Sequence, residues 1–96
     1  MPKKLSKKQM VCVEGGMCFW VNNGPVLKDL YELRDALKNM SDDTFVHHVS
    51  GDKNDFATWV EHVIQDAELA QKLLKCKTSA SMFKAVEKHL KSNYEL

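Results

Sequence analysis

The chain has 96 residues, 44% of them hydrophobic and 28% charged, so it can form one folded domain and is too apolar for wholesale disorder. No apolar run approaches the roughly 20 residues that a membrane-spanning helix requires, and we expect no membrane association. The formal charge of +1 gives no overall field that would attract nucleic acid or an anionic membrane surface.

The N-terminal segment is polar and basic, and it contains four lysines without an acidic residue: Lys3, Lys4, Lys7 and Lys8. We predict a disordered basic tail over residues 1–10, a single compact domain over 11–92 and a frayed C-terminus over 93–96. In an alternative interpretation the four lysines contact a phosphate backbone or an acidic partner. No aromatic or arginine side chain is interleaved with them, which makes this nucleic-acid signal a weak one.

The three cysteines, Cys12, Cys18 and Cys76, are an odd number and lack the spacing of a metal site. Free thiols in a reducing compartment are the simplest interpretation, and we therefore predict a cytoplasmic protein. Cys76 lies between two lysines, so we expect it to be the most exposed of the three.

Short apolar runs between glycine and asparagine residues predict a small antiparallel sheet of two or three strands. The runs are Val11–Val13, Met17–Val21 and Val26–Leu27. The Asn23-Gly24 pair is typical of a type I′ hairpin turn, in which both central residues have positive φ. Pro25 has no N–H to donate, so the strand that follows is expected at an edge.

Capped amphipathic segments follow from residue 29 to the end. Their predicted starts are Asp29, Ser41, Asn54 or Asp55, Asp66, and Thr78 or Ser79. The third segment is the most regular, because its apolar residues follow helical spacing without a gap over 56–64. The sequence therefore predicts an α+β fold, in which a small antiparallel β-hairpin or three-stranded sheet packs against four to five short helices.

The stretch from 41 to 74 contains three of the four histidines and one of the two tryptophans. By helical spacing, Phe45, Phe56 and Trp59 are predicted core anchors. His48 shares a face with Phe45, so we expect it to be partly buried and to need a polar partner. Asp55, at the start of the next helix, is the predicted acceptor, and the pair would fasten two helices together. A pH-sensitive or catalytic His48 is the alternative, which would require a nucleophile and a cleft.

A metal site at the His47-His48 pair, completed by Asp52, Asp55 or His62, is not favoured. Adjacent helical residues point about 100° apart, whereas a zinc pair on a helix sits at i and i+4. The sequence also lacks a phosphate-binding glycine loop, a nucleophile elbow and a distinct carboxylate pair. We predict neither a catalytic activity nor a cofactor.

Trp20 lies beside the predicted hairpin turn in a thin sheet, so it is expected to be more exposed than Trp59. Aromatic residues are enriched at interface hot spots, and an exposed edge strand offers unpaired backbone groups. Together with Asn22 and Asn23, Trp20 forms the predicted interaction surface.

Three blocks of the chain carry a resemblance: residues 19–40 (FWVNNGPVLKDLYELRDALKNM), residues 42–49 (DDTFVHHV) and residues 54–73 (NDFATWVEHVIQDAELAQKL). They resemble a small uncharacterised domain family of archaea and bacteria, which shares a Phe-x-x-His-Val element and an Asn-Asp-Phe-x-x-Trp-Val block leading to Asp-x-x-Leu-Ala. The resemblance covers about Cys18 to Leu74 and departs at Gln65, where similar sequences have glycine. It implies an accessory role and no defined activity.

We therefore predict a non-catalytic accessory or regulatory module that binds another protein. The alternative is a small nucleic-acid-binding protein that uses its basic N-terminal arm.

Overall fold

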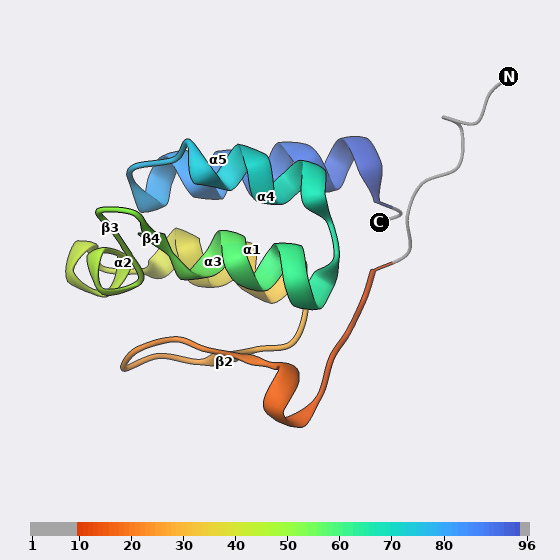
Figure 1. The fold of residues 1–96 in the computed structure, drawn as a ribbon, viewed down its shortest axis with the longest axis horizontal. Helices are drawn as coiled ribbons and strands as arrows, with labels where there is room; N and C mark the ends of the chain where they lie inside the picture. The colour runs from red at the N-terminus through yellow and green to blue at the C-terminus, as the bar shows by residue number, and fades with distance from the viewer. Residues whose placement is uncertain (1–9, 95–96) are drawn as a thin grey trace, which may run out of the picture.

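Five capped segments form five α-helices in the computed structural model, which describes residues 10–94 (Figure 1). They are α1 (Leu30–Asn39), α2 (Asp42–His48), α3 (Asp55–Trp59), α4 (Ala67–Leu74) and α5 (Ser79–Asn93). Two small antiparallel sheets complete the described fold, so the predicted α+β class is confirmed. The lysines predicted to form a basic arm lie outside the described residues, whereas Met10 packs against the core.

Each helix begins at a polar side chain that accepts a backbone N–H of the first turn, as the sequence predicts. The capping residues are Asp29, Ser41, Asn54, Asp66 and Thr78. Such caps satisfy donors that have no partner inside the helix. They depend on residues three apart, which is why the helix starts are readable from the sequence.

The first sheet has two strands, the smaller of the two predicted numbers. Strand β1 (Phe19–Trp20) pairs with β2 (Val26–Leu27), with Phe19 opposite Leu27 and Trp20 opposite Val26. The apolar run over 11–13, which would have supplied a third strand, does not form one. A 3₁₀ turn at Gly15–Met17 diverts the chain, and the Val13 N–H makes one hydrogen bond, 2.9 Å long, to the Lys28 carbonyl.

The hairpin turn differs from the predicted type I′ turn. Asn23 has a positive φ of 59°, but Gly24 is not among the residues with positive φ. The Gly24 N–H donates to the Val21 carbonyl over 3.0 Å, and one positive φ at the third position is the pattern of a type II turn. Glycine is still required for space, because a Cβ at residue 24 would lie 2.9 Å from Val21 Cγ1.

A second hairpin was not predicted. Strand β3 (Val49–Ser50) pairs with β4 (Lys53–Asn54) across a turn in which Gly51 has a φ of 57°. The sequence indicates the turn but not the strands, which are two residues each. This hairpin turns the chain from α2 into α3.

The elements lie at three levels in Figure 1, with α4 and α5 above, α1 and α3 in the middle and the β1–β2 hairpin below. Helix α1 packs against α5, and α3 packs against α4. The inward residues of α1 and α5 are completely or almost completely buried, as their helical spacing predicts: Leu30, Leu33, Leu37, Met82, Val86 and Leu90. The core therefore holds both upper levels together.

Helix α3 continues into a π-helical turn over Val60–Ile64, and the Asp66 N–H then donates to the Val60 carbonyl over 3.1 Å. The turn ends at Gln65, whose φ of 65° is in the left-handed region. Glycine adopts this region without steric cost, whereas a residue with a Cβ does not. The chain thus turns from α3 into α4 at Gln65, whose left-handed backbone conformation is strained.

Replacing Gln65 with glycine is expected to raise the free energy of unfolding by about 0.5–1 kcal/mol, because relief of the left-handed strain exceeds the added freedom of the unfolded chain. Urea denaturation monitored by circular dichroism measures the change. Gln65→Ala is the matched control, since it shortens the side chain but keeps the strain. Equal stability of the two variants would contradict this prediction.

The C-terminus corrects a further expectation. Helix α5 runs to Asn93, and Tyr94 is only 2% exposed. Residues 93 and 94 were predicted to be frayed, but both are packed. The reason is tertiary: the Tyr94 hydroxyl donates to Asp66, which lies 28 residues earlier in the chain.

Candidate functional site

Strand β1 presents its two residues to opposite sides, as successive strand residues do. Phe19 is buried and stacks on Phe56 with ring centroids 4.8 Å apart. Trp20 is 69% exposed, whereas Trp59 is 7% exposed and donates its indole N–H to the Met17 carbonyl. Trp20 is therefore more exposed than Trp59, as predicted.

The predicted core anchors Phe45, Phe56 and Trp59 are all buried. Their rings form one cluster with Phe19, in which Phe45 and Phe56 are stacked at 6.1 Å and Phe19 meets Trp59 edge-on at 5.8 Å. This aromatic cluster joins the β1–β2 hairpin to α2 and α3.

His48 lies where the hairpin turn, α2 and α3 meet, and it is 5% exposed. Its Nδ1 is 3.0 Å from Asp55 Oδ2, so the predicted contact between the two residues is present. A second contact was not predicted: the Asn22 N–H donates to His48 Nε2 over 3.0 Å. Because Nε2 accepts, the ring is neutral with its proton on Nδ1, which donates to Asp55. His48 therefore fastens the hairpin turn as well as the two helices.

Asp55 is ionised in this arrangement. Partial burial raises the pKa of its carboxyl group, but hydrogen bonds from His48 and Lys53 and the positive charge of Lys53 outweigh burial and hold the pKa below its usual value. The Lys53 ammonium is 3.2 Å from Asp55 Oδ2. Both partners of the carboxylate, His48 and Lys53, contact its Oδ2 atom.

A groove of about 580 Å³ lies between the hairpin and α1, and we call it the hairpin groove. Its lining consists of residues 21–27 on the hairpin side, with Glu32, Asp35, Ala36, Asn39, Met40, Ser41 and Thr44 opposite. Two of the predicted interaction residues, Asn22 and Asn23, belong to this lining. The third, Trp20, lies outside it but pairs with Val26, which lines it. The structure thus brings the predicted surface residues to one region.

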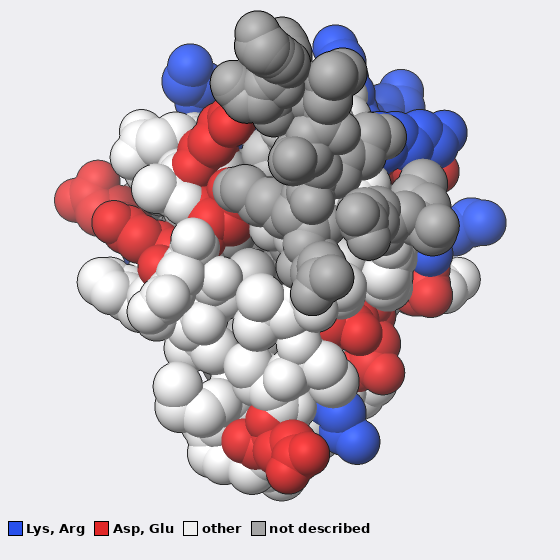
Figure 2. All heavy atoms as spheres, turned by 90° about the vertical axis from the view of Figure 1, so that its right-hand side faces the viewer, with Lys and Arg blue, Asp and Glu red and all other residues white. Residues whose placement is uncertain are grey.

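The hairpin region is uncharged. Residues 15–27 include no Lys, Arg, Asp or Glu, and Glu14 and Lys28 flank them. In Figure 2 the lower part of the molecule, where Figure 1 has the hairpin, is mostly white, apart from acidic and basic side chains near its lower end and acidic ones at its right edge. Met17, three residues before Trp20 in the chain, is a second large apolar side chain that is exposed, at 52%.

The histidine pair does not assemble a metal site. His47 is exposed, and its ring stands nearly perpendicular to that of His48, with centroids 4.9 Å apart. Within residues 10–94 no group of three or more His, Cys, Asp or Glu side chains could hold a metal ion. In the same part of the chain, no helix is long and apolar enough to cross a membrane.

The cysteines correct one expectation. Cys76 was predicted to be the most exposed, but it is 9% exposed, and burial raises the pKa of its thiol. Cys12 is the exposed one instead, and all three thiols are free. The two lysines beside Cys76 misled the prediction, because the end of α4 turns the cysteine inward, where its thiol contacts the Lys72 carbonyl.

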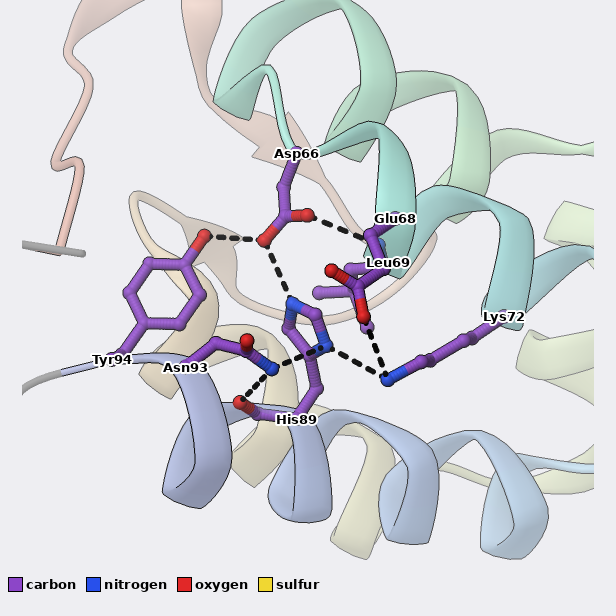
Figure 3. A network of polar contacts seen from close by, with 7 residues as sticks. All are labelled: Asp66, Glu68, Leu69, Lys72, His89, Asn93 and Tyr94. Atoms are coloured by element: carbon purple, nitrogen blue, oxygen red, sulfur yellow. Dashed lines mark hydrogen bonds and ion pairs between the residues drawn. The ribbon is translucent and has the colours of Figure 1, made fainter. Parts of the chain in front are cut away.

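A buried polar network joins α4 to α5, and sequence reasoning missed it (Figure 3). The Asp66 carboxylate accepts the Tyr94 hydroxyl at 2.6 Å, the Leu69 N–H at 3.0 Å and His89 Nε2 at 2.9 Å. On the other side of the ring, His89 Nδ1 lies 3.1 Å from both Lys72 Nζ and Asn93 Nδ2. Both of these are donors, so Nδ1 accepts and the proton on Nε2 is donated to Asp66.

Asp66 is ionised although it is 1% exposed. Burial raises the pKa of the carboxyl group, but the hydrogen bonds from Tyr94, Leu69 and His89 outweigh it and lower the pKa to about 2. Burial, together with the hydrogen bond to the charged Asp66, raises the pKa of the Tyr94 hydroxyl. Asp66, His89 and Tyr94 are each no more than 2% exposed, so a substrate does not reach them. We interpret the network as structural.

One signal in the sequence could have revealed His89. It follows Met82 by seven residues and Val86 by three, which places it on the apolar face of α5. A histidine on such a face needs a buried partner. No spacing rule would have selected Asp66 and Tyr94 as that partner set, since they are 23 and 5 residues away.

Compared with models of protein families, with curated proteins and with solved structures, the chain matches none. The resemblance noted from its sequence blocks accordingly stays a prediction.

Proposed function

We propose that this protein is a non-catalytic accessory or regulatory module that binds another protein through its hairpin surface, defined as Met17, Trp20, Asn22, Asn23 and Val26. The exposure of Trp20 carries the proposal. A tryptophan that is 69% exposed on an uncharged hairpin is poorly placed for stability and well placed for binding. The pairing of Trp20 with Val26 extends this surface into the hairpin groove.

The buried polar contacts support a binding role over a catalytic one. His48 and His89 each have both ring nitrogens engaged by protein groups, and the acidic partners Asp55 and Asp66 are hydrogen-bonded as well. General acid–base catalysis needs such a group within reach of a substrate proton. We therefore propose no enzyme activity and no cofactor, and the free thiols support a cytoplasmic setting.

A protein partner is favoured over nucleic acid. The nucleic-acid alternative depends on the four lysines within residues 1–9. The charged residues outside 10–94 are these four lysines and Glu95. Residues 10–94 therefore carry ten basic and twelve acidic side chains, a formal charge of −2. Such a domain does not itself attract a phosphate backbone.

Replacing Trp20 with alanine is expected to weaken binding at least about tenfold and to leave thermal stability unchanged, because the side chain is exposed but central to the surface. Short random peptides displayed on phage would be selected on the immobilised wild-type chain. Affinities of the enriched peptides would then be measured by fluorescence anisotropy.

Leu74→Ala is the matched control, since Leu74 is 49% exposed on α4, away from the hairpin. Its affinity for the same peptides should equal that of the wild type. The proposal is wrong if no peptide family is enriched, or if Trp20→Ala binds the enriched peptides as tightly as the Leu74 variant does.

A further inference from the structure

The charges that line the hairpin groove are of one sign. Glu32 and Asp35 are three residues apart on α1, and no lysine or arginine is among the lining residues. Glu32 Oε1 accepts the Lys28 N–H at 2.8 Å, and Asp35 Oδ1 pairs with Arg34 at 3.1 Å. The other carboxylate oxygen of each residue has no hydrogen-bond partner among residues 10–94. A cationic side chain would complement this wall.

The hairpin wall also offers an open strand edge. The Val21 N–H donates to the Pro25 carbonyl, so in the alternating antiparallel ladder Trp20 and Val26 form the non-hydrogen-bonded pair. The N–H and carbonyl of Val26 therefore point away from β1. Strand β2 is an edge of its two-stranded sheet, and an extended segment can add to such an edge through main-chain hydrogen bonds. Two residues further on, Lys28 already uses its N–H with Glu32 and its carbonyl with Val13, so the open part of this edge is at Val26.

The remaining lining suits a peptide rather than a lone cation. Within residues 10–94, the side-chain amides of Asn22 and Asn23 make no hydrogen bond, so they can meet peptide N–H and carbonyl groups. Val21, Ala36 and Met40 provide apolar surface for the aliphatic stem of a long basic side chain. The groove is thus lined by the backbone edge of β2, by the free side-chain amides of Asn22 and Asn23 and by the acidic wall of α1.

We infer that the hairpin groove binds an extended segment of a partner protein that carries lysine or arginine, with its basic side chain at Glu32 and Asp35 and its backbone beside Val26. This inference rests on the proposed function and specifies the chemistry of the partner.

The test uses the peptides selected on the wild-type 96-residue chain. The enriched peptides should contain lysine or arginine, and the Glu32→Gln/Asp35→Asn variant should bind them about five- to twentyfold more weakly. Glutamine and asparagine keep the acceptor oxygens that Lys28 and Arg34 use, so the substitutions remove charge and little else. Asp52→Asn/Glu61→Gln is the matched control, because it removes two exposed negative charges outside the groove and should leave affinity unchanged.

The outcomes separate this inference from the proposed function. Two results would show that the partner segment is not cationic: enriched peptides without basic residues, or equal affinity of the two charge variants for the peptides. Neither result would contradict the proposed function as a protein-binding module. If no peptide is enriched, both fail. If only a chain lacking residues 1–9 binds the peptides, the protein's own lysine-rich segment occupies the groove, and the inference of a partner segment is wrong.

Amide hydrogen exchange tests the backbone part independently. On saturation with an enriched peptide, exchange at the Val26 amide should slow about tenfold or more, as its N–H enters a new hydrogen bond. The amide of Lys53, in the other hairpin, serves as the control and should not change. Unchanged exchange at Val26 would overturn the strand-addition mode.

Discussion

Replacing Asp66 with alanine is expected to lower the free energy of unfolding by about 3–5 kcal/mol. The carboxylate has three donors, from Tyr94, Leu69 and His89, and all of these would be left unpaired in the interior. Removal of one member of a buried charged network costs this much because its partners keep their desolvation penalty. For a domain of this size, such a loss lowers the midpoint of thermal unfolding by more than about 10 °C.

Urea denaturation of the wild type and the Asp66→Ala variant measures the effect. Asp29→Ala is the control for the capping role alone, because Asp29 caps α1 on the surface, and its loss should cost about 1 kcal/mol. Tyr94→Phe removes a single hydroxyl from the network and should cost about 1–3 kcal/mol. If Asp66→Ala is no worse than Asp29→Ala, the network does not stabilise the fold.

The acid dependence of stability follows from the lowered pKa of Asp66. The pKa falls from an ordinary value of 3.8 to about 2 in the folded state, so the folded protein holds the proton less tightly than the unfolded chain. The stabilisation by the Asp66 carboxylate is therefore complete above the unfolded pKa and is lost as the pH falls toward 2. The difference in stability between the wild type and Asp66→Ala should narrow over this range.

Replacing His48 with alanine is expected to cost about 1–3 kcal/mol, because Asp55 loses a donor and the Asn22 N–H loses its acceptor. The ring also packs against Phe19 and Phe56, with centroids 5.0 and 5.2 Å away. The variant should therefore loosen the hairpin before the helices, and the Asn22 amide should exchange faster than in the wild type.

His47→Ala is the matched control, since His47 is the adjacent residue of the same helix and is exposed. It should change the stability by no more than about 0.5 kcal/mol. Equal stability of the two alanine variants in urea denaturation would show that the contacts of His48 with Asn22 and Asp55 do not stabilise the fold.

The His48 fastener also connects stability with the proposed binding surface. Asn22 lines the hairpin groove through its side chain and is held through its backbone by His48. A peptide that adds along β2 would meet a turn that is already positioned, which lowers the ordering cost of binding.

The sequence by itself determined the parts of this fold whose causes are local. Ser41 and Thr78 start their helices by accepting an N–H three residues ahead, so a short window contains the whole interaction. Helical periodicity likewise identified Phe45, Phe56 and Trp59 as buried, because a helix that packs on one side must carry its apolar residues there. The exposure of Trp20 followed from its place in a thin hairpin.

Only the tertiary structure decided the features that join distant segments. His48 reaches Asn22 across 26 residues, and Asp66 reaches Tyr94 across 28, and no periodicity specifies a partner at such a separation. From the sequence, Tyr94 was predicted to belong to a frayed end. It is ordered because α5 packs beside the start of α4. The hairpin groove also depends on tertiary packing. Its acidic residues are on α1 and its strand edge is on the hairpin, and they line one groove only because the hairpin packs beside α1.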